Sequence, residues 1–374
     1  MKKIFAILMA LVLVSLMIGC APAIVASNTG KSSHAAATIP DNRPYWPTTE
    51  WKTTTPAEQG MDGSALEQIT AYVRDSGLPV DSVIVLRHGY IVYEKYFGSQ
   101  WDENTLHNIF SCTKSIMGSL VGIALQQGKI NSLDDRMVDY FPNRTIRNLD
   151  ARKKAVRLID LMTMKGGFDW PERSYPYTDP RNPWIQALRS NDTVQFVLDA
   201  PMAVKPGTVW AYNGGFSQLL SAIVTYKTGM STMEFAKENL FGPLGITKFI
   251  WKTDRQGIYD AGGGLSMTPR DMAKYGHLIL NKGIWEGKQI IPADFIAESV
   301  KTQTLFNANS GYGYESWWTI PPYGYYYAAG IRGQRIYVME KQDMVVVTTA
   351  NLPEDSQTGM KMLKIAQYAV SACK

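Results

Sequence analysis

The chain has 374 residues, of which 45% are hydrophobic, with 31 Gly and 19 Pro. This composition is that of an ordinary globular protein and excludes a fibrous or an intrinsically disordered chain. The formal net charge is +5, and it falls to +3 if Lys2 and Lys3 are removed with an export signal. So small a basic excess does not favour nucleic-acid binding.

The first twenty residues are typical of an export signal, because Lys2 and Lys3 precede an uncharged run over residues 4–19 that ends at Cys20. The segment Leu-Met-Ile-Gly-Cys at residues 16–20 resembles a bacterial lipobox. We therefore expect residues 1–19 to be a signal peptide, and Cys20 to be lipidated and to anchor the protein to a membrane. An uncleaved anchor, for which the run is marginally short, and an ordinary secretory signal remain open. All three interpretations place the folded part outside the cytoplasm.

Residues 20–55 are rich in Ala, Ser, Thr and Pro and show no apolar periodicity. This composition predicts a flexible tether that follows the lipidated cysteine. The folded domain is expected over residues 56–374, with order beginning near Asp62.

The first predicted elements are a helix and a hairpin. Asp62 can cap a helix that Gly77 ends. Residues 82–87 and 90–97 are rich in β-forming residues and are joined at His88-Gly89, which indicates a hairpin.

The middle of the chain, about residues 111–301, predicts mostly helices and long loops. Residues 115–127 have apolar positions on one helical face. Near the end of the chain, β-forming residues again predict strands, at 325–328, 335–340 and 344–349. A last helix is expected at 360–372. The pattern therefore predicts an α/β (α+β) fold: one antiparallel sheet built from both ends of the chain, flanked by helices, with an inserted helical subdomain.

Ser111 and Lys114 stand three residues apart at the predicted start of a helix. A serine hydroxyl is a poor nucleophile at neutral pH and needs a base within hydrogen-bond reach, and this spacing puts both side chains on one helical face. The helix N-terminus is expected to lower the pKa of Lys114 and to stabilise an oxyanion beside Ser111. Alone, the Ser-x-x-Lys spacing is weak evidence for a catalytic site, since the same spacing recurs at residues 371–374, where the chain ends.

Four further segments stand in a definite order with the serine motif. The five are Ile-Phe-Ser-Cys-Thr-Lys-Ser (109–115), Leu-Ile-Asp-Leu-Met-Thr-Met (158–164), Tyr-Asn-Gly-Gly (212–215), Ala-Gly-Gly-Gly-Leu (261–265) and Gly-Ile-Arg-Gly-Gln (330–334). Through them the chain resembles, over about residues 58–370, the serine β-lactamase and penicillin-binding-protein superfamily, in its class C-like esterase and amidase branch.

The resemblance implies roles for four residues. Ser111 corresponds to the nucleophile, Lys114 to the lysine that takes or relays its proton, and Tyr212 to the tyrosine that passes the proton to the leaving group. The backbone N–H groups of Ser111 and Ile331 correspond to the oxyanion hole. Whether Lys114 or Tyr212 is the base remains open.

The chain departs from the family pattern in two motifs. The Tyr-x-Asn motif reads Tyr212-Asn213-Gly214, so Asn213 stands one place early and only its position suggests a substrate contact. The third motif, Lys-Thr-Gly or His-Thr-Gly in the family, reads Ala328-Ala329-Gly330 and lacks its cation. This loss argues against efficient β-lactam or D-Ala-D-Ala turnover. Arg332 could restore the charge, with Ala329 and Gly330 lining the substrate site, or it could be an exposed strand residue.

Several other patterns favour ordinary structural roles. Lys227-Thr228-Gly229 spells the third motif but follows a helical run, so it predicts a helix C-terminus. Cys112 should point about 100° away from Ser111 on the helix and fill the core. The four histidines have no metal-ligand spacing, and we expect neither a metal nor another cofactor.

Aromatic residues are dense in four places: 170–177, Trp184, 317–318 and 323–327. Core packing and an aromatic-lined cleft for an apolar acyl or amide chain both explain them, and Trp170 is a candidate substrate contact.

The interpretation is therefore a serine hydrolase that cleaves an amide or ester of a small molecule through an acyl-enzyme. A β-lactamase or D-alanyl-D-alanine carboxypeptidase, and a catalytically silent envelope binding protein, are the alternatives. The sequence does not determine the substrate or the oligomeric state.

Overall fold

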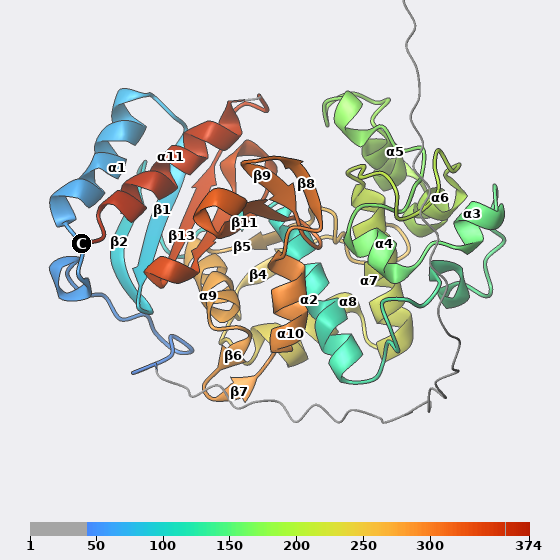
Figure 1. Ribbon diagram of the computed structural model, residues 1–374, viewed down its shortest axis with the longest axis horizontal. Helices are drawn as coiled ribbons and strands as arrows, with labels where there is room; N and C mark the ends of the chain where they lie inside the picture. The colour runs from blue at the N-terminus through green and yellow to red at the C-terminus, as the bar shows by residue number, and fades with distance from the viewer. Residues whose placement is uncertain (1–42, 356) are drawn as a thin grey trace, which may run out of the picture. The chain divides into compact units, whose positions relative to one another are not determined.

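The computed structural model describes residues 43–355 and 357–374 (Figure 1). The predicted signal peptide, Cys20 and most of the predicted tether lie outside these residues. Within them, no helix combines the length and the apolar character that crossing a membrane requires.

The main sheet is antiparallel and has eight strands in the order β2-β1-β13-β12-β11-β10-β9-β8. The hairpin nearest the N-terminus thus joins the last strand of the chain in one sheet, with β1 directly beside β13 and β2 outside β1, as the sequence predicts. The strands are β1 (Val80–Arg87), β2 (Tyr90–Tyr96), β8 (Thr304–Asn307), β9 (Ser310–Tyr312), β10 (Trp317–Ile320), β11 (Tyr325–Ala329), β12 (Arg335–Met339) and β13 (Met344–Ala350).

Strand β13 lies inside the sheet because its sequence suits burial on both faces. All seven of its residues, Met-Val-Val-Val-Thr-Thr-Ala, are buried, and β-branched side chains of this kind pack well on a pleated surface. It pairs with β1 on one side and with β12 on the other.

Helices cover both faces of this sheet. On one face α1 (Gly63–Asp75) and α11 (Thr358–Ser371) lie side by side, and they share a core with alternate residues of β1, β12 and β13. On the other face α9 (Pro269–Leu280) packs on β12 and β13. Since alternate strand residues point to opposite faces, the two cores follow from the period-2 pattern.

The remaining elements form the helical part and two small sheets. The helical subdomain predicted at about residues 111–301 is not wholly separate from the main sheet, because α9 lies within this range and packs on β12 and β13. The helices are α2 (Cys112–Gln126), α3 (Ala151–Lys154), α4 (Leu158–Met162), α5 (Pro183–Arg189), α6 (Thr193–Asp199), α7 (Gly214–Thr228), α8 (Thr232–Ala236) and α10 (Ala293–Val300); the small sheets are β3 (His107–Asn108), β5 (Leu265–Met267) and β4 (Phe249–Trp251), and β6 (Ile284–Trp285) with β7 (Lys288–Gln289).

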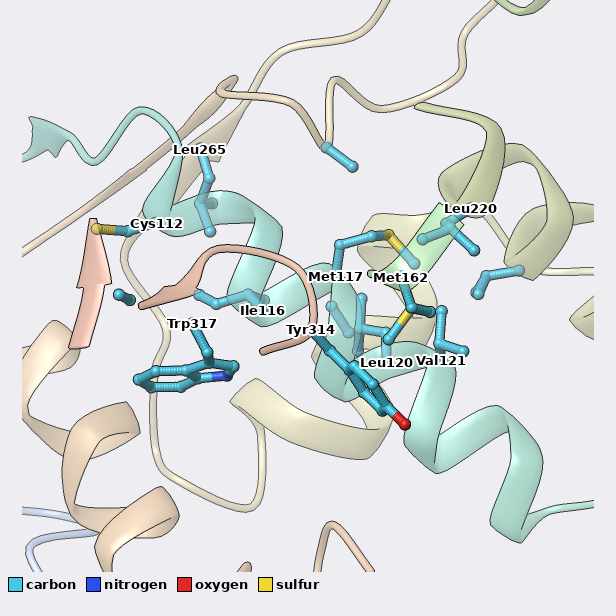
Figure 2. Close-up of a cluster of buried hydrophobic side chains, with 14 of the residues drawn as sticks. Cys112, Ile116, Met117, Leu120, Val121, Met162, Leu220, Leu265, Tyr314 and Trp317 are labelled. Carbon is cyan, nitrogen blue, oxygen red and sulfur yellow. The ribbon is translucent and has the colours of Figure 1, made fainter. Parts of the chain in front are cut away.

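Helix α2 is buried along most of its length, from Cys112 to Ala124. Figure 2 shows its side chains Met117 and Leu120 near Met162 of α4, within the larger core. The helix is therefore enclosed by the rest of the domain and not laid on its surface. The site residues at its N-terminus therefore stand on a fixed support.

The predicted tether extends too far along the chain, because residues 43–55 pack on the domain. Arg43 forms an ion pair with Asp343 at 2.5 Å, and the ring of Trp46 lies 4.9 Å from that of Trp285. Thr53 forms a β-bridge with Ile91 of β2. The expectation that order begins near Asp62 is therefore wrong. The segment is held by single contacts such as that of Trp46, which produce no apolar periodicity in the sequence.

Candidate active site

The structure brings together the three side chains that the sequence predicts to be catalytic. Tyr212 donates a hydrogen bond to Ser111 Oγ at 2.7 Å, and Lys114 Nζ lies 3.3 Å from the same oxygen. All three residues are buried. The phenol of Tyr212 thus comes from a distant part of the chain to meet the Ser111 hydroxyl and the neighbouring Lys114 amine.

A strained turn places Ser111 at the start of α2. Phe110, just before it, has a φ of 45°, in the left-handed region that non-glycine residues rarely adopt. Asn108 accepts a hydrogen bond from the Phe110 amide at 2.9 Å, and Phe110 in turn accepts one from the Thr113 amide. These bonds hold the turn that presents the hydroxyl.

The Lys114 ammonium is fixed by a backbone carbonyl and by an aromatic ring. Its Nζ donates to the carbonyl of Gly262 and lies 5.0 Å from the centre of the Tyr212 ring. A β-carbon at position 262 would stand 2.4 Å from Trp184. The first glycine of the Ala-Gly-Gly-Gly-Leu segment is thus required for close packing beside the site.

Burial and mutual charge set the protonation of this pair. Burial alone would lower the pKa of Lys114, but the negative potential of Tyr212 and Glu172 outweighs it and raises that pKa. Burial also raises the pKa of Tyr212, against the effect of the Lys114 charge. The charge of each group thus shifts the pKa of the other, so the two groups titrate as a pair. The expectation that the helix terminus lowers the pKa of Lys114 is wrong, because nearby acidic groups dominate.

The end of β11 packs against the turn that carries Ser111. A β-carbon on Gly330 would lie 2.3 Å from the Ile109 carbonyl oxygen, and Cys112 Sγ lies 3.7 Å from the carbonyl oxygen of Gln334. Among the described residues, neither the Ser111 amide nor the Ile331 amide donates a hydrogen bond to the carbonyl of another turn, loop or strand. Their role as donors to an oxyanion stays a prediction.

A cleft of about 560 Å³ opens above Ser111. Its wall is aromatic on several sides, and charged residues stand among the rings. The aromatic members are Tyr175, Tyr177, Tyr212, Trp318 and Tyr327, and the charged ones are Glu172, Arg173, Arg332, Arg335, Glu354 and Asp355.

The candidate substrate residues fall into two groups. Ala329, Gly330 and Arg332 line the cleft, whereas Trp170 and Asn213 do not. The Trp170 indole donates to Glu172 Oε2 at 2.7 Å. Asn213 is buried, and neither polar atom of its side chain has a hydrogen-bond partner among the described residues.

Arg332 is held at the rim of the cleft. It donates to Asn351 Oδ1 at 3.2 Å, lies 3.7 Å from Glu354, and stacks its guanidinium 5.8 Å from the Phe110 ring. Its charge is thus shared with an acid rather than free.

Two buried acids near the site carry no sequence signal. Glu172 accepts hydrogen bonds from the Tyr177 hydroxyl at 2.9 Å and the Gly214 amide at 2.6 Å, so it ties the cleft wall to the start of α7. Glu315 accepts from Ser217 Oγ at 2.6 Å, and burial raises its pKa to about 8.

The Lys-Thr-Gly segment at 227–229 and Cys112 both have the structural roles that the sequence predicts. The segment 227–229 ends α7, with Gly229 in the left-handed conformation. Cys112 is fully buried, and burial raises the pKa of its thiol to about 12. A thiol in this state is a poor nucleophile.

Comparisons with known proteins identify the family of this chain. The family model named Beta-lactamase matches residues 65–369. The 6-aminohexanoate-dimer hydrolase of Paenarthrobacter ureafaciens is 25% identical over 297 residues, covering 73% of each chain. An Escherichia coli K12 protein provisionally assigned as a D-alanyl-D-alanine carboxypeptidase is 27% identical, over 52% of this chain and 49% of its own.

Solved structures support the fold. A Bacillus anthracis protein provisionally assigned as a 6-aminohexanoate-dimer hydrolase superposes with a TM-score of 0.68, at 24% identity, over 80% of both chains. The chain belongs to the beta-lactamase family, whose fold it shares.

Proposed function

We propose that the protein is a serine hydrolase that cleaves an amide or ester bond of a small molecule through an acyl-enzyme on Ser111. One observation carries the proposal: Ser111 Oγ is within hydrogen-bond reach of both Tyr212 and Lys114 at the base of a cleft. A nucleophile that contacts two proton-transferring groups is the arrangement that acyl transfer requires.

The chemistry can be followed atom by atom. In the form of the Tyr212–Lys114 pair that has lost one proton, either a phenolate beside the ammonium or a phenol beside a neutral amine, the pair takes the Ser111 hydroxyl proton as Oγ attacks the carbonyl carbon. The Ser111 and Ile331 amides stabilise the negative oxygen that forms. Collapse of this intermediate breaks the bond to the leaving amine or alcohol, which takes the proton back from the pair. Water then repeats the sequence and frees the acid and Ser111.

The cleft favours a linear amide or a short ester as the substrate. Aromatic walls suit an apolar acyl chain, and one similar protein is named for the 6-aminohexanoate dimer. The missing cation at Ala328 argues against β-lactams and D-Ala-D-Ala peptides. The partial similarity to a provisionally assigned D-alanyl-D-alanine carboxypeptidase keeps that activity as the second candidate.

Labelling with a fluorophosphonate probe tests the proposal. We expect the purified protein to be labelled and Ser111→Ala to lose the label. Ser115→Ala is the matched control, because Ser115 lies on the same helix, buried and outside the cleft. An unlabelled wild-type protein would contradict the hydrolase. Hydrolysis of p-nitrophenyl esters, 6-aminohexanoate oligomers, D-amino-acid peptides and a chromogenic cephalosporin then ranks the substrates.

We also propose that the enzyme is exported and is held at a membrane by lipid on Cys20. The support is the charged, apolar and lipobox-like order of residues 1–20. Labelled fatty acid should appear in the wild-type protein expressed in a bacterium and not in Cys20→Ala. Equal labelling of the two proteins would reject lipidation at this cysteine.

A further inference from the structure

The peptide group between Gly330 and Ile331 carries one of the two proposed oxyanion donors. The Ile331 N–H and the Gly330 C=O belong to one planar unit and point in opposite directions. Whatever holds the carbonyl of Gly330 therefore also sets the direction of the Ile331 N–H.

Arg335 binds this carbonyl from the neighbouring strand. Arg335 stands on β12 directly opposite Ala329 of β11. Its Nη1 donates to the carbonyl of Gly330 and, at 2.7 Å, to that of Gln334. Gln334 in turn accepts from the Gly330 amide at 2.9 Å. The turn is thus closed around one guanidinium nitrogen.

The position of this guanidinium is unusual for a charged group. Arg335 is only 7% exposed, its Nε is buried without a partner among the described residues, and the hydrogen-bond acceptors given above are backbone carbonyls. Burying a charge that no carboxylate neutralises costs stability. Such a cost is commonly retained at functional sites.

A charged donor on a carbonyl has an electronic effect as well as a geometric one. Hydrogen bonds to ionised groups are stronger than neutral ones, and hydrogen bonds in a chain polarise one another. A cation on the Gly330 oxygen draws electron density from the amide nitrogen. The Ile331 N–H then becomes a stronger donor on the opposite side of the same peptide.

We propose that Arg335 is a positioning residue of the oxyanion hole, which orients and polarises the Gly330–Ile331 peptide toward the negative oxygen of the transition state. The proposal rests on the serine-hydrolase function proposed above. It separates Arg335 from Arg332, which is nearer in sequence to the donor but is bound to Asn351 and Glu354 at the rim.

Kinetics of Arg335 variants on p-nitrophenyl butyrate, a neutral ester, test the proposal. We expect Arg335→Met to lower kcat by about 10- to 100-fold and to change KM by less than about threefold, because the donor acts mainly in the transition state. Affinity for phenylboronic acid, whose adduct with Ser111 carries a tetrahedral anion, should fall in parallel with kcat. Arg335→Lys, which keeps the positive charge, should retain part of the wild-type kcat and part of the affinity for phenylboronic acid.

Arg87→Met is the matched control. Arg87 lies on the same sheet, also donates through Nη1 to a backbone carbonyl, that of Gln342, and also has a buried Nε without a partner among the described residues. It does not line the cleft. A merely structural arginine should behave as Arg87 does, with a lower melting temperature and an unchanged kcat.

The outcomes separate this proposal from the function on which it rests. Failure of the wild-type protein to hydrolyse any ester or to react with fluorophosphonate rejects the hydrolase itself. An active wild type, with Arg335→Met at wild-type kcat and boronate affinity, rejects only the role of Arg335. A rise in KM confined to carboxylate-bearing esters would instead make Arg335 a substrate-binding residue and would also overturn the proposal. If Arg335→Met does not fold, the same readouts on Arg335→Lys decide.

Discussion

At the scale of single residues, the site depends on how three polar groups share one proton. Ser111 Oγ accepts a hydrogen bond from the Tyr212 hydroxyl, and Lys114 Nζ stands 3.3 Å away. The pKa values of both partners are raised, so the pair must release one proton before it can act as a base. Attack requires the serine proton to move into the pair, so removing either partner should stop the transfer.

We expect Lys114→Ala and Tyr212→Phe each to slow acylation by on the order of 100-fold or more, the scale of lost acid–base catalysis. Stopped-flow release of p-nitrophenol measures this rate. Tyr275→Phe is the control for the phenol, because Tyr275 is also buried and its hydroxyl donates to the Ser115 carbonyl oxygen at 2.8 Å and not to Ser111 Oγ. Wild-type rates in either site variant would overturn the assigned roles.

Glu315 should make stability depend on pH. Its folded pKa of about 8 lies above the ordinary value of 4.5, because burial disfavours the carboxylate. Between these values the unfolded chain is ionised while the folded protein keeps the proton, so folding takes up a proton. The Glu315 contribution to stability is therefore present below pH 4.5 and is lost as the pH rises toward 8, by at most about 1.4 kcal/mol per pH unit.

The variant Glu315→Gln copies the protonated acid and should remove this dependence. Urea unfolding at pH 5 to 8 should show a flatter profile for the variant and a higher free energy of unfolding than wild type at pH 8. Parallel profiles for the two proteins would show that Glu315 does not titrate in this range.

The sequence identifies the site residues that belong to short motifs and misses those that tertiary packing supplies. Ser111 and Lys114 are visible because helix geometry brings residues three apart together, and Tyr212 because an ordered set of motifs surrounds it. Glu172 and Arg335 reach the site from a loop and from a neighbouring strand. No regular spacing in the sequence indicates that these two residues lie near Ser111.

At the scale of elements, the active site forms where the end of β11 meets the start of α2. Gly330 makes this approach possible, because any β-carbon there would overlap the Ile109 carbonyl. The acceptor belongs to the backbone and cannot rotate away. One methyl group should therefore separate the oxyanion donor from the nucleophile.

We expect Gly330→Ala to lower kcat for ester hydrolysis by on the order of 100-fold, because the Ile331 amide moves away from the oxyanion. The overlap should also destabilise the protein by about 1–3 kcal/mol. Gly63→Ala is the control, since a β-carbon there meets only Pro56, at 3.6 Å. Circular dichroism and kinetics on both variants separate the effects, and unchanged kcat in Gly330→Ala would argue against the proposed oxyanion hole.

The late strands show what an element must contain to be predicted. The sequence predicts strands β11, β12 and β13, because each is rich in β-branched or aromatic residues. It does not predict β8, β9 and β10, which are only three or four residues long; β9 also contains a glycine, and β10 begins with two tryptophans. Each of these short strands is held by its neighbours in the sheet, β8 by β9, β9 by β10 and β10 by β11.

At the scale of the whole folded part, the two ends of the domain close on each other. The Lys374 amide donates to the Gly60 carbonyl at 2.9 Å, and the Asp62 amide donates to the Ala372 carbonyl at 2.7 Å. Residues 43–55 extend this closure across the edge of the sheet and onto the β6–β7 region. A segment that would otherwise be a linker thus joins elements from both ends.

Removing this segment should weaken the whole domain. A chain that begins at Glu58 lacks the Arg43–Asp343 ion pair, the Trp46 contact with Trp285, and the Tyr45 hydroxyl bond to the Gly89 carbonyl at 2.7 Å. We expect its melting temperature to be at least about 5 °C below that of a chain beginning at Asp41, because a loss of a few kcal/mol shifts the transition by this much. Calorimetry on the two chains measures the difference.

A chain beginning at residue 21 provides the control, since it adds only residues outside the described domain and should melt with the chain that begins at Asp41. The variant Arg43→Met in the chain that begins at Asp41 should reproduce part of the loss, because it leaves the Asp343 carboxylate, half-buried in the turn between β12 and β13, without its bidentate partner. Equal melting temperatures for the chains that begin at Asp41 and at Glu58 would mean that residues 43–55 rest on the domain without stabilising it. The boundary of the folding unit would then lie where the sequence first suggests, near Asp62.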